Sequence, residues 1–186
     1  VCSSDLHSSV TKISQFRFIF YNLLRYNGDW KSHRGRDTIL IKVRHLTKHY
    51  GDITAVDDLS VTIADNHIYG FLGPNGAGKT TTLNMITGCL AADCGEVTID
   101  GYDLLRAPRE AKRRIGYLPE QPPLYDDMTP EEYLAFVGDA KGLRGEKRRS
   151  AVEAAMQKTS ITDVRRRLIR NLSKGYRQRV GIAQAI

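Results

Sequence analysis

The residues best able to do chemistry form one continuous nine-residue segment. They are Gly73, Pro74, Asn75, Gly76, Ala77, Gly78, Lys79, Thr80 and Thr81. The segment matches the pattern G-x-x-x-x-G-K-[ST] at every fixed position, and this pattern forms a loop whose backbone N–H groups surround phosphates. A glycine-rich turn that only caps a helix would explain the glycines but not the Gly-Lys-Thr sequence. We therefore predict that this loop binds a nucleoside triphosphate.

Each residue type in this loop has a physical role toward a polyphosphate. Its glycines let the backbone wrap closely around an anion and point successive N–H groups at it. We expect the Lys79 amine on the β- and γ-phosphates as a point charge, and the Thr80 hydroxyl on a Mg²⁺ that bridges the same phosphates. Thr81 is expected to donate a further hydrogen bond to phosphate.

The flanking sequence indicates the elements that hold the loop. An apolar run at residues 68–72 precedes it and is typical of a buried strand, while Leu83, Ile86 and Leu90 follow at helical spacing. A helix that opens at Lys79 would add the positive end of its dipole to the phosphate site. The sequence therefore predicts a strand, the loop and a helix in succession.

The chain is predicted to continue with short strands and then helices. Thr129, Pro130 and Glu132 form a capping box with proline at the first helical position. A second helix is expected over residues 146–159. Strands are expected at residues 38–43, 53–61 and 97–99.

A segment near the C-terminal end narrows this interpretation to one family. Residues 172–179 resemble the signature motif of ABC ATPases, whose usual form is Leu-Ser-Gly-Gly-Gln. Here Lys174 stands in place of the first glycine, and Tyr176 and Arg177 come ahead of the glutamine. This variant is similar to that of ATPase subunits of ABC-2-type exporters.

Two further segments resemble motifs of the same family. Residues 115–121 are similar to its Q-loop, a strand that ends in a glutamine, here Gln121. Tyr50 lies where the family carries an aromatic residue that stacks on adenine. Together with the phosphate loop, the motifs follow the family's order over roughly Ile39 to Ile186.

The resemblance implies a fold and a set of roles. The fold is α/β, a P-loop NTPase core of the ABC ATPase type with an antiparallel β-subdomain and an inserted helical subdomain at about residues 128–172. ATP would lie against Tyr50, with Gln121 near the Mg²⁺ and the attacking water, and with Ser173 and Gly175 on the γ-phosphate of a second subunit's ATP. Taken from the residues alone, Tyr50 could be a strand-end aromatic, Gln121 a surface amide and Ser173 a helix N-cap.

The same resemblance implies partners and a location. Two ATP-binding subunits, expected to be a homodimer, would sandwich two ATP molecules and power a transmembrane permease from the cytoplasmic face of the membrane. A soluble ABC ATPase that acts on nucleic acid or ribosomes is the alternative, and a nucleotide sensor without catalysis is a third. No nucleic-acid partner is expected under the main interpretation.

Both ends of the chain depart from the family's pattern. The sequence stops at Ile186, before the positions of the Walker B aspartate, the catalytic glutamate and the switch histidine. We therefore expect a C-terminally truncated fragment, in which residues 39–186 form a partial nucleotide-binding domain. Residues 1–38 match nothing in the family and are expected to be a non-native or disordered extension, with an amphipathic arm or a real structural element as alternatives.

The net charge of +7 is concentrated in one part of the chain. Residues 141–179 carry 13 basic and 3 acidic side chains, whereas residues 39–140 carry 9 and 15. We expect the basic stretch to be a solvated helical face, with contact to acidic lipid headgroups as the alternative and nucleic acid third. The three cysteines, Cys2, Cys89 and Cys94, show no metal-binding spacing and are expected to be free thiols.

Overall fold

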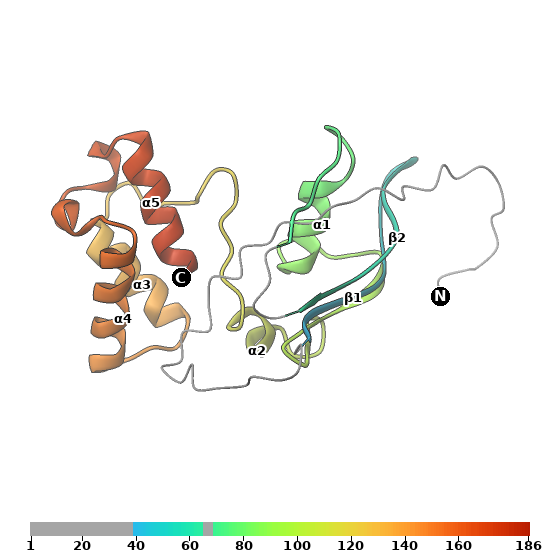
Figure 1. Cartoon of the computed structure of the whole chain (residues 1–186), viewed down its shortest axis with the longest axis horizontal. Coiled ribbons are helices and arrows are strands. Elements are labelled where there is room, and N and C mark those ends of the chain that lie inside the picture. The colour runs from blue at the N-terminus through green and yellow to red at the C-terminus, as the bar shows by residue number, and fades with distance from the viewer. Residues whose placement is uncertain (1–38, 65–68) are drawn as a thin grey trace. The chain divides into compact units, whose positions relative to one another are not determined.

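A computed structural model describes residues 39–64 and 69–186, which divide into two compact units (Figure 1). The first unit comprises the described residues up to Ile115, and the second runs from Gly116 to Ile186. The extension expected at residues 1–38 lies outside the described residues. Each unit is treated by itself below.

The first unit is built on a four-stranded antiparallel sheet with the order β2-β1-β3-β4. Figure 1 labels the strands β1 and β2 of this sheet. The strands predicted at residues 38–43, 53–61 and 97–99 are confirmed, because they lie in the first, second and third strands of the sheet. Thr38 is not described. The elements are β1 (Ile39–Tyr50), β2 (Ile53–Ala64), α1 (Lys79–Ile86), β3 (Cys94–Ile99), β4 (Tyr102–Asp103) and α2 (Pro108–Lys112).

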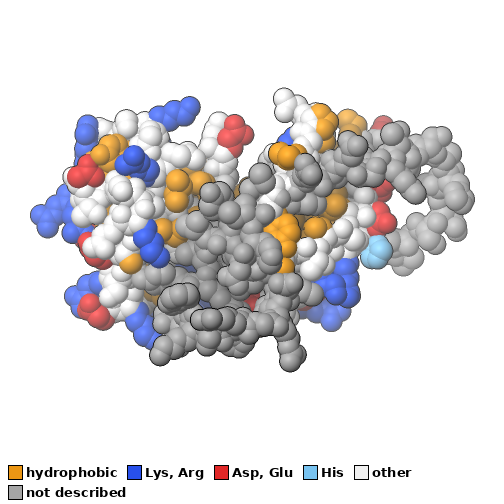
Figure 2. Space-filling view, viewed as in Figure 1, with side chains coloured by type: hydrophobic (Ala, Val, Ile, Leu, Met, Phe, Trp, Pro, Cys, Tyr) orange, Lys and Arg blue, Asp and Glu red, His pale blue; other side chains and the backbone are white. Residues whose placement is uncertain are grey.

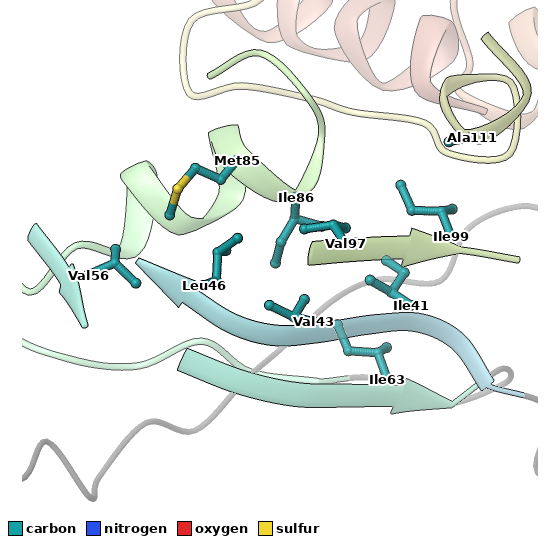
Figure 3. Close-up of a cluster of buried hydrophobic side chains, with 10 residues drawn as sticks. All are labelled: Ile41, Val43, Leu46, Val56, Ile63, Met85, Ile86, Val97, Ile99 and Ala111. Atoms are coloured by element: carbon teal, nitrogen blue, oxygen red, sulfur yellow. The ribbon is translucent and has the colours of Figure 1, made fainter. Parts of the chain in front are cut away.

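A cluster of buried aliphatic side chains joins α1 to this sheet (Figure 3). Met85 and Ile86 of α1 lie over Val43, Leu46 and Val97 of the strands, and all five are nearly inaccessible to solvent. Burying a side chain of this size contributes about 1.5–3 kcal/mol. The cluster therefore fixes the helix, and with it the glycine loop that leads into the helix.

Two predicted strands do not form, and one predicted helix is shorter than expected. Of residues 68–72, only 69–72 are described, and there Leu72 alone makes an isolated bridge. Residues 115–121 contain no strand. Apolar sequence is not sufficient for a strand, because a strand also needs a hydrogen-bonding neighbour, and the sheet in the described part contains only β1 to β4. Helix α1 ends at Ile86, since Gly88 turns the chain with a φ of +71°.

The second unit is helical. It contains α3 (Pro130–Ala140), α4 (Gly145–Lys158), the 3-10 turns η1 (Thr162–Val164) and η2 (Ile169–Asn171), and α5 (Lys174–Ala185). The predicted capping box is confirmed, since the Thr129 hydroxyl accepts from the Glu132 amide at 3.3 Å and the Glu132 carboxylate accepts from the Thr129 amide at 2.9 Å. The helix predicted at 146–159 is confirmed as α4. Among the described helices, none has the length and apolar character needed to cross a bilayer.

The helices of this unit pack around a second apolar cluster, in which Met156, Ile161, Ile169 and Val180 are fully buried. Six of its basic side chains also form ion pairs with carboxylates. Figure 2 shows lysine and arginine side chains spread over the surface of this unit with acidic side chains among them. The paired arginines are Arg144, Arg148, Arg149, Arg165, Arg170 and Arg177.

The expectation of free thiols is correct for one described cysteine and wrong for the other. Cys89 is free and exposed, whereas Cys94 is disulfide-bonded. The expectation rested on the number and spacing of the cysteines, which do not decide whether a disulfide forms.

Candidate nucleotide-binding site

The phosphate loop is shaped by two glycines in the left-handed backbone region. Gly76 has a φ of +83° and Gly78 a φ of +78°, and between them the Ala77 amide donates to the Pro74 carbonyl at 3.3 Å. Non-glycine residues adopt this region only at a cost of about 1–2 kcal/mol. A turn with left-handed residues is the backbone form that presents N–H groups to an anion.

Helix α1 begins directly at the end of this loop, and its first turn is open. Gly78 is the N-cap, has no side chain to cap the helix, and is followed by no acidic residue in the first turn. The first helical hydrogen bond runs from the Thr82 amide to the Gly78 carbonyl at 2.8 Å. Within the described chain, the amides of Lys79, Thr80 and Thr81 therefore have no acceptor. Free N–H groups and the positive end of the helix dipole make such a terminus a site for phosphate.

The Lys79 side chain folds back onto the backbone of the loop. Its amine donates to the carbonyls of Gly73 at 2.7 Å and Pro74 at 2.6 Å, so the charge is held within the loop. The neighbouring threonines differ in their surroundings. Thr82 is buried and its hydroxyl donates to the Gly78 carbonyl, whereas Thr80 is exposed. The Thr80 hydroxyl is thus available to a metal or phosphate.

Gly78 also has a packing role that the sequence did not reveal. A Cβ at this position would lie 2.1 Å from the Ala55 carbonyl oxygen and 3.2 Å from Cγ2 of Val56. Ala55 is the extra residue of a β-bulge, because Lys48 pairs with Val56 while the next residue of β1 pairs with Thr54. The bulge therefore brings the backbone of β2 against the end of the phosphate loop, and only glycine fits there.

This contact places Tyr50 in the same unit as the loop and at the same end of the hairpin. Tyr50 is the last residue of β1 and pairs with Ile53, two residues before Ala55. Its side chain is half exposed, and the Lys48 amine lies over the ring at 5.8 Å from the centroid. An exposed ring at this position suits adenine stacking, which stays a prediction.

The other predicted site residues belong to the second unit. Gln121 is exposed and has no hydrogen bond to any described residue. The Ser173 hydroxyl caps α5 by accepting from the Tyr176 amide at 3.4 Å, so the structural role considered for it is present. A Cβ on Gly175 would meet only the Ser173 hydroxyl, at 4.0 Å, so no packing contact requires a glycine there. Their roles toward a nucleotide remain predictions.

Within the second unit the Q-loop segment packs along α5, the helix that carries the signature. A Cβ on Gly181 would lie 2.7 Å from Cγ of Pro122 and 2.8 Å from Cδ1 of Leu118. The side-chain amide of Gln184 donates to the Tyr117 carbonyl at 2.7 Å. Sequence reasoning missed these residues, although a glycine in the middle of a helix was a usable signal of close packing.

The predicted Mg²⁺ ligands fit the general chemistry of that ion but are not gathered within one unit. Thr80 lies in the first unit and Gln121 in the second. The described residues contain no group of three histidine, cysteine or acidic side chains that could hold a metal. Mg²⁺ at phosphate sites keeps several waters and phosphate oxygens and needs few protein ligands, so one hydroxyl in the loop is compatible with it.

Comparisons with known proteins found similar sequences among ATP-binding proteins. The chain is 37% identical over 150 residues to the lipopolysaccharide export system ATP-binding protein LptB of Haemophilus influenzae, covering 79% of this chain and 62% of that protein. It is 40% identical over 135 residues to the ABC transporter ATP-binding protein NatA of Bacillus subtilis, covering 72% of this chain and 55% of that protein. It is 35% identical over 147 residues to the bacitracin transport ATP-binding protein BcrA of Bacillus licheniformis, covering 79% of this chain and 47% of that protein. The chain thus spans about half to three fifths of the length of these relatives.

Solved structures show the same fold. The ATP-binding subunit of an ABC transporter superposes with a TM-score of 0.67 at 27% identity, covering 78% of this chain and 61% of the other. The structure of cbiO1 from Clostridium perfringens gives a TM-score of 0.64 at 22% identity, covering 80% of this chain and 61% of the other. The predicted fold, an α/β P-loop NTPase of the ABC ATPase type, is therefore confirmed. The family model described as ABC transporter matches residues 56–186, and the chain belongs to the ABC transporter family.

Proposed function

We propose that this chain is the ATP-binding and ATP-hydrolysing part of a subunit that powers an ABC-type membrane transporter. The proposal rests on one observation: α1 begins with an uncapped first turn directly after a loop that contains two glycines with positive φ. The amides of the first turn of α1 have no acceptor in the described chain, and the Lys79 amine bonds to carbonyls of the same loop, which supports the proposal. A polyphosphate is the ligand whose charge and oxygen acceptors such a set of donors fits.

Each loop residue then has a role toward the substrate. The amides of Lys79, Thr80 and Thr81 would bind phosphate oxygens, and the Lys79 amine would exchange its bonds to Gly73 and Pro74 for phosphate oxygens. The Thr80 hydroxyl would be a ligand of Mg²⁺, with Gln121 as a second. When bound, Mg²⁺ neutralises charge on the phosphates of the substrate.

Dimerisation and coupling to a permease are the finer parts of the proposal. Ser173 and Gly175 would contact the γ-phosphate of ATP held by a second copy, because α5 presents a capped N-terminus with no bulk at Gly175. A permease partner is supported by the relatives LptB and BcrA, which are ATP-binding proteins of an export system and of a transport system. The signature variant supports an ABC-2-type exporter, and the protein would then lie at the cytoplasmic face of the membrane.

Calorimetric titration of the chain with Mg²⁺-ATP tests the proposal. The Lys79→Ala variant should bind about tenfold more weakly or worse, because charge-assisted hydrogen bonds to phosphate are lost. Lys147→Ala removes an exposed lysine on α4 and is the matched control, which should bind like the original chain. Equal affinity of the Lys79→Ala variant and the original chain would contradict the assignment of the loop.

A further inference from the structure

The end of β1 contains a side-chain arrangement that the loop chemistry does not use. Asp93, just before β3, accepts a hydrogen bond from the Lys48 amine at 2.7 Å and another from the His49 amide at 2.7 Å. Its own amide donates to the Thr47 carbonyl at 3.0 Å. One carboxylate thus fixes the strand end that carries Tyr50.

The Lys48 side chain connects this carboxylate to the Tyr50 ring. Lys48 and Tyr50 are two residues apart on β1 and therefore project from the same face of the strand. The Lys48 side chain is only 14% exposed, and its amine lies over the ring within the range of a cation–π contact. A free lysine would be flexible and strongly hydrated, so the bond to Asp93 is what keeps the charge at the ring.

The electrostatics of Asp93 agree with this geometry. The pKa of its carboxyl is lowered, first by the hydrogen bond from Lys48 and then by that from the His49 amide. The carboxylate is therefore ionised at neutral pH, and the ion pair with Lys48 is present under ordinary conditions.

We propose that Lys48 and Asp93 are positioning residues for the nucleotide base: Asp93 holds the Lys48 amine on one face of Tyr50 and leaves the other face to the base. This inference rests on the proposed nucleotide-binding function and adds the means by which the base platform is held. The two residues act on the base and not on the phosphates, and they stiffen a ring that is otherwise half exposed at the end of a hairpin.

The test compares a ligand that has a base with one that has none. Mg²⁺-ATP and Mg²⁺-tripolyphosphate are titrated by calorimetry into the original chain and into the Lys48→Met and Asp93→Asn variants. ATP affinity should fall about two- to fivefold in each variant, the fold-change that corresponds to an exposed cation–π contact. Tripolyphosphate affinity should not change. Arg44→Met is the matched control, because its pair with Glu96 also links β1 and β3, at 3.0 Å, but does not touch Tyr50.

A double-mutant cycle separates positioning from a general effect on the fold. In a Tyr50→Ala background, Lys48→Met should cost no further ATP affinity, because the ring through which it acts is gone. Unchanged ATP affinity in the single variants, or equal losses for ATP and tripolyphosphate, would overturn the inference. Failure of the original chain to bind either ligand would instead overturn the proposed function, and the inference with it.

Discussion

The two units hold their site residues in different ways. In the first unit the phosphate loop is held by a backbone contact, because the Ala55 carbonyl of the β2 bulge lies against Gly78. In the second unit the Ala185 carbonyl likewise lies against Gly116, but exposed ion pairs between side chains make many of the links between the helices. Asp139 of α3 binds Arg148 of α4 at 2.6 Å, and Asp126 binds Arg177 of α5 at 2.7 Å.

This difference predicts different sensitivities. A site fixed by backbone contacts has no room for an added methyl group, because carbonyl groups in a sheet cannot move aside cheaply. A unit linked by exposed ion pairs tolerates such changes better, since each pair contributes little and is screened by salt. It should respond more to pH and to changes of charge.

The largest effect is expected from Gly78→Ala in the first unit. The new methyl group would overlap the Ala55 carbonyl and would force a left-handed alanine, so the free energy of unfolding should fall by about 3 kcal/mol or more. Urea denaturation followed by circular dichroism measures this loss. Gly76→Ala is the control, because it has a similar φ but no atom within 4 Å of the new Cβ, and it should cost only about 1–2 kcal/mol. Equal losses would show that the contact with Ala55 contributes nothing.

In the second unit, Gly181→Ala is the corresponding test. Its methyl group would press on Pro122 and Leu118, which are side-chain contacts, and overpacking of this kind costs about 1–3 kcal/mol. The same denaturation experiment reads the effect. Gly175→Ala adds its methyl group to open space on the same helix and should not lower the stability. A loss from Gly181→Ala as large as that from Gly78→Ala would remove the contrast between the units.

Tyr50→Ala addresses binding and not stability. If the ring stacks on adenine, ATP binding should weaken by about 1–3 kcal/mol, the scale of base stacking on an aromatic side chain. Calorimetry with Mg²⁺-ATP measures it, and Tyr50→Phe should be nearly silent because the ring is kept. Equal weakening by both substitutions would indicate that the hydroxyl matters and that stacking does not.

The smallest effect is a response of the second unit to acid. Hydrogen bonding by Arg165 lowers the pKa of Glu153 from its ordinary 4.5, and the Thr129 amide does the same for Glu132. A carboxyl whose pKa is lower in the folded state stabilises the fold above its unfolded pKa, and this contribution is lost as the pH falls below about 4.5. Thermal melting from pH 7 to pH 3 should show a shallower decline for Glu153→Gln. Glu110→Gln, an exposed glutamate of α2, should leave the decline unchanged.

Local features of the sequence were predicted well because short-range contacts decide them. Thr129 and Glu132 form their capping box within one helical turn, and the positive φ of Gly76 and Gly78 follows from a motif in which glycine is required. The strands predicted at residues 53–61 and 97–99 also formed, although the second of them pairs with the distant strand β1. The capping box and the glycine turns do not depend on a distant part of the chain.

Whether an apolar segment becomes a strand could not be predicted from local sequence alone, because a strand also needs a neighbouring strand. Residues 69–72 and 115–121 are apolar enough for strands, yet in the described chain they do not join the sheet of β1 to β4. The second of these segments instead packs on α5, where Gln184 binds the Tyr117 carbonyl. A strand is stabilised by its neighbour, and the neighbour is not encoded in the segment itself.

The sequence by itself determined the predicted chemistry: a lysine, a threonine and glycines at fixed spacing match the pattern of a phosphate-binding loop wherever the loop is placed. Only the tertiary structure decided which contacts hold that chemistry in place. The contact between Ala55 and Gly78 joins residues 23 positions apart. The hydrogen bonds between Asp93 and the end of β1 join residues at least 44 positions apart. Such contacts arise because a bulge and a strand pairing bring distant backbones together, and no local spacing in the chain encodes that meeting.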